Sequence, residues 1–162
     1  MTGTVVWITG LPASGKSTLA ARVRAALAAP SVILDSDDVR DVLGEAGYDA
    51  DRRDLFYLRL ARLAALLAGQ GLVVLVAATS NLARHRDAAR AAAPRYLEVW
   101  VRTPLAEVMR RDPKGLYARA RRGEAPDLPG VGAPYEAPAA PDVVADGGLD
   151  DAAVGAILRR LA

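Results

Sequence analysis

A glycine-rich stretch near the start of the chain has the spacing of a phosphate-binding loop. Four residues fit G-x-x-x-x-G-K-[ST], the P-loop pattern: Gly10, Gly15, Lys16 and Ser17. The glycines let the backbone wrap around a phosphate, the lysine reaches the β- and γ-phosphates, and the serine hydroxyl ligates Mg²⁺. The pattern lies between an apolar, β-branched run at 5–8 and an alanine-rich run at 19–27, the strand–loop–helix context that such a loop requires. We therefore predict a triphosphate site that uses Mg²⁺.

Carboxylates follow the next predicted strand. The apolar run at 31–34 predicts a strand, and Asp35, Asp37 and Asp38 come directly after it. Open α/β sheets bind ligands at the carboxyl ends of their strands, so these side chains are expected to face the phosphate loop. There they can hold Mg²⁺ through water and accept a proton from an attacking hydroxyl group. The alternative role is structural, because Asp37 or Asp38 can cap a helix over 39–43.

The scarcity of lysine singles out a second basic residue. Of the 21 Lys and Arg residues only two are lysines, Lys16 and Lys114. Because a compact ammonium group differs from a planar guanidinium group, both lysines are candidates for positions where arginine does not serve. His85 lies among arginines with no base–nucleophile pair nearby, so we expect a surface histidine. The chain has no cysteine, which excludes disulfides and thiol chemistry and, with a single histidine, argues against a zinc site.

Strand and helix patterns alternate along the chain. We predict strands at 5–8, 31–34, 72–77, 96–101 and 142–145, helices at 19–27, 51–70, 82–92, 118–122 and 150–161, and a further helix opened by Pro104. Such alternation is typical of an α/β fold with a single parallel sheet and helices on both faces. The stretch 123–141 is rich in Pro, Gly and Ala without periodicity, as lids and binding loops are. We expect one P-loop domain over 1–162 with a lid at about 114–136.

The long helix predicted at 51–70 carries an apolar stripe and several arginines. Its stripe follows helical spacing and consists of Phe56, Leu60, Leu63 and Leu67. Arg52 and Arg53 either reach phosphates or are solvated, whereas Arg59 and Arg62 are expected to be solvated.

Length, composition and charge limit the classes of protein to which the chain can belong. The chain has 162 residues, 52% of them hydrophobic and 25% charged, enough for a globular domain with a real core. No apolar run approaches the length of a membrane span and no signal peptide is recognisable, so we expect a cytoplasmic protein without a membrane partner. The formal net charge is +2, whereas a nucleic-acid-binding protein gathers more net charge on one face. A mild positive balance suits small anionic substrates.

Further blocks resemble one family of P-loop kinases. The stretch DPKGLYARARRGE at 112–124, followed by APYEAP at 133–138, is highly specific, and LDSDDVR at 34–40 matches the family pattern LDGDNVR. On these residues, and on the TPL sequence at 103–105, the chain resembles adenylylsulfate (APS) kinase from its first strand to about Val144. The resemblance implies transfer of the γ-phosphoryl group of ATP to the 3′-hydroxyl of APS, giving PAPS and ADP, in sulfate assimilation. Members of this family commonly form homodimers, so the resemblance also implies a possible homodimer for this chain.

The resemblance also implies roles for individual residues. ATP would contact Gly10, Ala13, Ser14, Gly15, Lys16, Ser17, Thr18, Arg111, Ala133 and Pro138. The acceptor nucleotide would contact Asp37, Arg40, Tyr48, Arg52, Ser80, Leu82, Arg86, Lys114 and Leu128. Catalysis is implied for Lys16, Asp35, Asp37 and Lys114, and Mg²⁺ is implied at Ser17 and Asp37.

The chain departs from the family pattern mainly on the acceptor side. The sequence TSNL at 79–82 replaces the family's ISP(F/Y), Leu55 replaces an asparagine that contacts APS, and Pro126 replaces a lid lysine. Leu128 replaces a phenylalanine that forms one face of the adenine sandwich, and a missing stacking face costs about 1–3 kcal/mol. Two alternatives follow: a related kinase acting on another modified nucleotide, such as cytidine diphosphoramidate, and a non-catalytic nucleotide-binding protein.

Overall fold

The structure, a computed structural model, describes residues 2–162 and contains one five-stranded parallel sheet in the order β2-β3-β1-β4-β5. The strands are β1 (Thr4–Thr9), β2 (Ser31–Asp35), β3 (Val73–Ala77), β4 (Tyr96–Val101) and β5 (Val143–Ala145). Each pair of neighbouring strands is parallel. The predicted α/β class and all five predicted strands are confirmed, with ends that shift by at most one residue.

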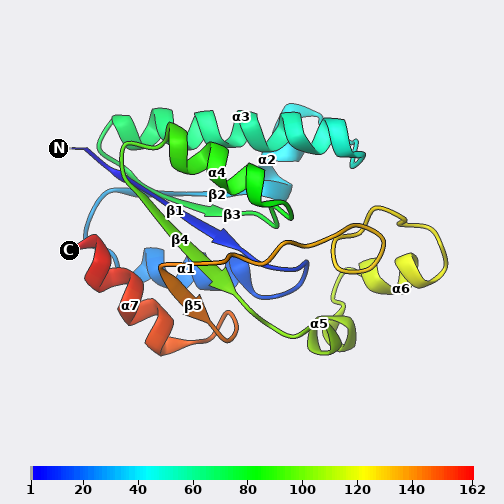
Figure 1. Ribbon diagram of the computed structural model, residues 1–162. Helices are drawn as coiled ribbons and strands as arrows, with labels where there is room; N and C mark the ends of the chain where they lie inside the picture. The colour runs from blue at the N-terminus through cyan, green and yellow to red at the C-terminus, as the bar shows by residue number, and fades with distance from the viewer. Residues whose placement is uncertain (1) are drawn as a thin grey trace.

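Helices cover both faces of the sheet, as the alternating pattern predicts. The helices are α1 (Lys16–Ala26), α2 (Ser36–Leu43), α3 (Ala50–Gly69), α4 (Ala83–Ala92), α5 (Leu105–Arg111), α6 (Leu116–Arg121) and α7 (Asp151–Leu161). Figure 1 shows α3 and α4 on one face, α1 and α7 on the other, and α5 and α6 beyond the carboxyl ends of the strands. Within residues 2–162, no helix combines the length and apolarity needed to cross a membrane.

The central strand β1 is buried on both of its faces. Val6 and Ile8 pack with apolar side chains of α1 and α7, whereas Val5 and Trp7 pack with those of α3 and α4. Successive side chains of a strand point to opposite faces, so both cores draw on the same strand. This double burial explains why β1 appears in the sequence as an unbroken apolar run.

Helix α3 buries a face that differs from the predicted stripe. Its buried residues are Arg53, Phe56, Tyr57, Leu60, Ala61, Ala64 and Ala68. Leu63 and Leu67, predicted to lie in the stripe, are only half-buried at its margin. Small alanines occupy the centre of the contact with the sheet, so a pattern built on large apolar residues placed the stripe wrongly at its carboxyl-terminal end.

Helices α5 and α6 and the loop after them form a small core of their own. Val108, Tyr117 and Leu128 are buried together there, apart from the two cores that flank the sheet. The Tyr117 hydroxyl donates a hydrogen bond of 2.8 Å to the carbonyl oxygen of Pro12 in the glycine-rich loop. The predicted lid is therefore packed directly against the predicted phosphate-binding loop.

Helix α6 begins earlier than the basic helix predicted at 118–122. Asp112 accepts hydrogen bonds from the backbone N–H groups of Tyr117 (3.0 Å) and Ala118 (2.9 Å). Gly115, with φ of 65°, turns the chain just before the first residue of α6. This side-chain cap, five residues before its first partner, has no simple spacing signal in the sequence.

Candidate active site

The loop between β1 and α1 has the close approaches that the glycine pattern predicts. Gly15 has φ of 105°, and a Cβ on it would lie 2.5 Å from the backbone nitrogen of Gly148. A Cβ on Gly10 would lie 2.6 Å from both the Oγ of Ser14 and the carbonyl oxygen of Val101. Only glycine fits at these two positions. The loop leads directly into the N-terminus of α1, whose free N–H groups and dipole favour an anion.

The Lys16 ammonium group lies against the loop itself. Its Nζ donates to the carbonyl oxygens of Gly10 (3.1 Å) and Leu11 (2.8 Å). Burial lowers the pKa of Lys16 to about 8, against the opposing effect of the Asp35 and Asp37 carboxylates. A partly buried cation interacts more strongly with a polyanion placed beside it than a fully solvated one does.

Asp35 links the loop to the end of β2. Its Oδ2 accepts a hydrogen bond from the Ser17 hydroxyl, and its Oδ1 accepts one of 3.0 Å from the backbone N–H of Asp37. The latter bond caps α2, so the alternative role, in which Asp37 or Asp38 caps this helix, is wrong. The reason is that α2 follows β2 without a break, which makes the last strand residue the cap. Asp38 is exposed and lies outside the cavity described below.

Asp37 and Lys114 join α2 to the lid. The Lys114 Nζ lies 2.5 Å from the Asp37 Oδ2, and this hydrogen bond raises the pKa of Lys114. Both side chains are more than half exposed, so solvent screens the pair and it adds little stability. The pair places the second lysine of the chain beside a carboxylate of the predicted site.

One cavity of about 590 Å³ connects these groups. Its walls come from the glycine-rich loop, the start of α2, one face of α3 and the lid. The predicted site residues that line it are Ala13, Gly15, Lys16, Ser17, Thr18, Asp35, Asp37, Arg40, Tyr48, Lys114 and Leu128. The predicted site residues outside its walls are Gly10, Ser14, Arg52, Ser80, Leu82, Arg86, Arg111, Ala133 and Pro138.

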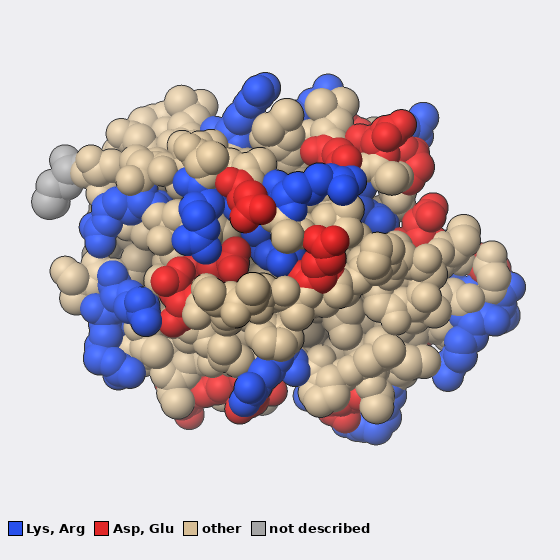
Figure 2. Space-filling view, viewed as in Figure 1, with Lys and Arg blue, Asp and Glu red and all other residues tan. Residues whose placement is uncertain are grey.

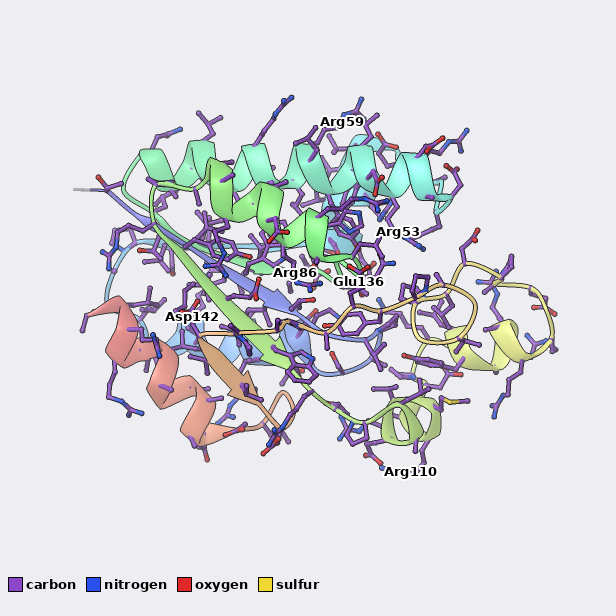
Figure 3. All side chains as sticks on the ribbon, viewed as in Figure 1. Arg53, Arg59, Arg86, Arg110, Glu136 and Asp142 are labelled. Carbon is purple, nitrogen blue, oxygen red and sulfur yellow. The ribbon has the colours of Figure 1, made fainter. Side chains whose placement is uncertain are left out.

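Two buried arginines form one wall of the cavity. The Arg40 guanidinium lies 3.8 Å from the centroid of the Phe56 ring and 4.6 Å from that of Tyr48. The Arg53 Nη2 donates a hydrogen bond of 2.8 Å to the carbonyl oxygen of Asp127 in the lid. Figure 3 shows this arginine between α3 and the lid. Each arginine is 6% exposed, and within residues 2–162 neither forms an ion pair with a carboxylate. Buried charges without a counter-charge favour an anionic ligand.

The structure separates Arg52 from Arg53. Arg52, predicted to contact the acceptor, is exposed and lies 3.4 Å from Asp49 in an ion pair, whereas Arg53 faces the cavity. From the sequence, Arg53 could either contact a phosphate or be solvated. The available signal was helical phase, because Arg53 precedes Phe56 and Tyr57 by three and four residues and so shares their buried face.

Ser80 and Arg86 lie outside the cavity walls, and Arg86 holds a strap of chain at 132–142. The buried Ser80 Oγ accepts a hydrogen bond of 2.9 Å from the Trp7 Nε1. The Arg86 guanidinium donates to the carbonyl oxygens of Ser80 (2.8 Å) and Glu136 (2.6 Å), and Figure 3 shows Arg86 and Glu136 close together below α4. Within the described residues, these contacts connect Ser80 with β1 and α4, and Arg86 with the strap.

Three residues predicted on the ATP side lie around the lid. Arg111 is exposed and forms an ion pair of 2.7 Å with Glu107. Ala133 forms part of the lid turn, where its carbonyl oxygen accepts a hydrogen bond of 2.9 Å from the backbone N–H of Gly130. Pro138 is buried in the strap.

His85 is buried, so the prediction of a surface histidine is wrong. Its side chain is 3% exposed, and its Nε2 lies 2.6 Å from the Asp54 Oδ1. Helix α4 packs along α3, which turns this position inward although arginines flank it in the sequence.

Charge on the molecular surface is mixed. On the face drawn in Figure 2, basic and acidic side chains are interspersed, without the continuous basic area that nucleic acid requires. Within residues 2–162, no three His, Asp or Glu side chains gather in a metal cage. An Mg²⁺ ion bound with a nucleotide needs only one or two protein ligands, so this finding fits the predicted kind of site.

Comparison with known proteins gives a consistent set of relatives. The sequence model of a family described as adenylylsulphate kinase matches residues 2–146. An adenylyl-sulfate kinase of Deinococcus deserti is 46% identical over 146 residues, covering 88% of this chain and 81% of the relative. The bifunctional enzyme NodQ of Azospirillum brasilense is 46% identical over 155 residues, 91% of this chain. The chain spans only a quarter of the length of NodQ.

A solved structure agrees over nearly the whole fold. The Mycobacterium tuberculosis APS kinase CysC, solved in complex with AMPPNP and APS, superposes with a TM-score of 0.89 at 40% identity. The match covers 96% of each chain.

Proposed function

Because the chain belongs to the adenylylsulfate kinase family, we propose that it transfers the γ-phosphoryl group of ATP to the 3′-hydroxyl of APS, giving PAPS and ADP. The observation that carries the proposal is one cavity lined by Lys16, Asp35, Asp37 and Lys114. Phosphoryl transfer needs mainly positioning and electrostatic stabilisation, which these charged groups supply. The M. tuberculosis relative binds an ATP analogue and APS, which supports the same two ligands here.

The donor half of the cavity suits an ATP–Mg²⁺ complex. The glycine-rich loop and the N-terminus of α1 would bind the phosphates, and Lys16 would neutralise their charge. The contact between the Ser17 hydroxyl and the Asp35 carboxylate supports these two oxygens as the protein side of the metal site. When bound, Mg²⁺ stabilises charge on the transferring phosphate. This contact favours Asp35 over Asp37, the carboxylate that the family resemblance implied.

The acceptor half suits a nucleotide with an anionic phosphosulfate group. Arg40 and Arg53 would receive that group, because both are buried in the cavity wall without a carboxylate partner in the described chain. Tyr48 is 53% exposed at the rim and offers its ring to the adenine. Leu128, in the lid, supplies an apolar contact where the family has an aromatic ring.

Asp37 is the proposed proton acceptor. Its carboxylate would take the proton from the 3′-hydroxyl as that oxygen attacks the γ-phosphorus and the bond to the departing ADP breaks. Lys114, paired with Asp37, would sit beside the developing negative charge on the transferring group. The remaining lid residues would exclude water from the cavity.

The direct test is product formation by the purified protein. With Mg·ATP and APS, we expect PAPS and ADP in equal amounts, measured by ion-pair chromatography. A parallel reaction with cytidine diphosphoramidate tests the alternative acceptor. Absence of PAPS at saturating APS would reject the proposal, and ATP binding without turnover of either acceptor would support the non-catalytic alternative.

Replacement of Arg53 by methionine is expected to raise the KM for APS by about 10–100-fold, because the acceptor anion loses a buried guanidinium partner. The KM for ATP should change little, since Arg53 lies on the acceptor wall. The matched control is Arg52→Met on the same helix turn, where the side chain is exposed and paired with Asp49. Equal effects of the two substitutions on the KM for APS would contradict the assignment of Arg53.

Binding of ATP is expected to take up protons at pH values near 8. Lys16 has a pKa of about 8 in the free protein, so about half of its ammonium groups are deprotonated there. Bound triphosphate favours the charged form and raises this pKa, whereas at about pH 6 the group is already charged and no uptake is expected. Titration calorimetry in buffers of different ionisation enthalpy measures the uptake. Lys16→Met should abolish it, and a binding enthalpy independent of buffer at pH 8 would contradict the prediction.

A further inference from the structure

His85 is a buried titratable group behind the acceptor wall and outside the cavity. Its ring packs on Tyr57 at 4.5 Å between centroids, with the ring planes inclined by 39°. Tyr57 in turn lines the cavity. The histidine therefore touches the back of a residue whose other side faces the ligand.

The hydrogen bonds of His85 select one neutral tautomer. Its Nδ1 faces the backbone N–H of Leu82 at 3.4 Å and must accept there, because that partner is a donor. Its Nε2 therefore carries the proton and donates to the Asp54 carboxylate at 2.6 Å. In this way the neutral ring caps α4 through Leu82 and joins α4 to α3 through Asp54.

The surroundings of His85 disfavour a second proton. Asp54 is already held by Arg84, whose guanidinium contacts it at 2.8–3.2 Å. The other titratable or charged groups facing this region are Arg53 and Tyr57 of α3 and Glu136 of the strap. Burial lowers the pKa of His85, and the hydrogen bond to Asp54 opposes that shift. A proton on Nδ1 would point one donor at another, the N–H of Leu82.

We propose that neutral His85 is a positioning residue for the acceptor, holding Tyr57 and the adjoining wall of α3 in place, and that its protonation weakens acceptor binding. The proposal rests on the proposed kinase function. Protonation would break the contact with Leu82 and displace the ring that supports Tyr57. Acceptor affinity then falls as the pH falls through the pKa of His85. The glycine-rich loop leads into α1, which covers the face of the sheet opposite α4 (Figure 1), so ATP affinity does not follow this titration.

The test exploits the fact that the chain has a single histidine. Long-range ¹H–¹⁵N NMR spectra of the protein labelled at histidine should show the Nε2–H tautomer and a pKa below about 6.5, the ordinary value. Added APS should lower that pKa further, because a ligand that prefers the neutral form favours deprotonation. An Nδ1–H tautomer, or a titration that APS leaves unmoved, would overturn the proposal.

Kinetics of two variants give the second readout. Between about pH 8 and pH 5.5, the KM of the unaltered protein for APS should rise about 10-fold while the KM for ATP does not follow the histidine titration. His85→Gln keeps a donor for Asp54 and an acceptor for Leu82 but does not titrate, so its KM for APS should stay within about 2-fold across this range. His85→Phe keeps the ring but neither hydrogen bond, and should raise the KM for APS at every pH.

The outcomes separate this proposal from the proposed function. If the unaltered protein makes no PAPS, the kinase proposal fails and the role of His85 in acceptor binding fails with it. If the protein makes PAPS but His85→Gln shows the same rise in the KM for APS at low pH, only the role of His85 is overturned. Thermal melting of each variant at both pH values verifies that the compared proteins are folded.

Discussion

Replacement of Lys16 by methionine is expected to lower kcat/KM for ATP by about 10³-fold. The methionine keeps an unbranched chain of similar length but removes the ammonium group that would neutralise the β- and γ-phosphates. A loss of this size corresponds to about 4 kcal/mol of transition-state stabilisation, the magnitude observed when one preorganised donor is removed from a site that excludes water. PAPS formation at saturating APS, with ATP varied, measures the effect.

Lys16→Arg is the matched control because it retains the charge. The ammonium group fits between the carbonyl oxygens of Gly10 and Leu11, at 3.1 and 2.8 Å. A planar guanidinium on a longer stem does not reproduce this arrangement, so Lys16→Arg should recover less than about a tenth of the lost activity. Activity of Lys16→Met within about 10-fold of the unaltered protein would remove the basis for the kinase proposal.

The fold was predictable because local and global signals agree along most of the chain. Double burial of the strands gives unbroken apolar runs, and Gly10 and Gly15 lie where no Cβ fits. The apolar stripe of α3 was predicted only in part, since small alanines rather than large side chains form much of its contact with the sheet. Periodicity arguments weigh large apolar residues and therefore miss such a face.

The glycine-rich loop of the candidate site has a local signal in the sequence, whereas the proposed acceptor wall has none. Contiguous residues form the glycine-rich loop, so spacing alone identifies it. The proposed acceptor wall combines α2 and α3 with the lid, which is distant from both in sequence. Arg53, one position after the predicted Arg52, is the arginine that lines the cavity. On a helix, neighbouring residues differ by about 100° in direction, so such a shift decides whether a side chain faces the ligand or the solvent.

Some features depend on contacts that no local pattern encodes. His85 is buried because α4 packs along α3, and Arg86 fixes the strap through the carbonyl oxygen of Glu136, fifty residues away. Each contact joins segments whose proximity exists only in the folded chain. The homodimer and the cytoplasmic location stay predictions, because a single chain carries no observation that bears on them.

Replacement of Asp37 by asparagine is expected to lower kcat by about 10²–10⁴-fold, the usual contribution of a general base. The amide is nearly isosteric with the carboxylate but cannot take the proton of the 3′-hydroxyl. The substitution also removes the negatively charged partner of Lys114. The KM for ATP should stay close to that of the unaltered protein, since the loop that would bind the phosphates is unchanged. Single-turnover measurements with premixed ATP and APS isolate the chemical step.

Asp38→Asn provides a control that differs by one position on the same helix turn. Asp38 is exposed and outside the cavity, whereas Asp37 lines it beside Lys114. Both substitutions remove one negative charge from the first turn of α2, so any effect on the helix dipole is shared. Only Asp37→Asn removes the carboxylate that lines the cavity, and with it the proton acceptor and the partner of Lys114, so kcat of Asp38→Asn should stay within about 3-fold of the unaltered protein. Equal losses in the two variants would assign the effect to α2 as a whole and leave the reaction without its proposed base.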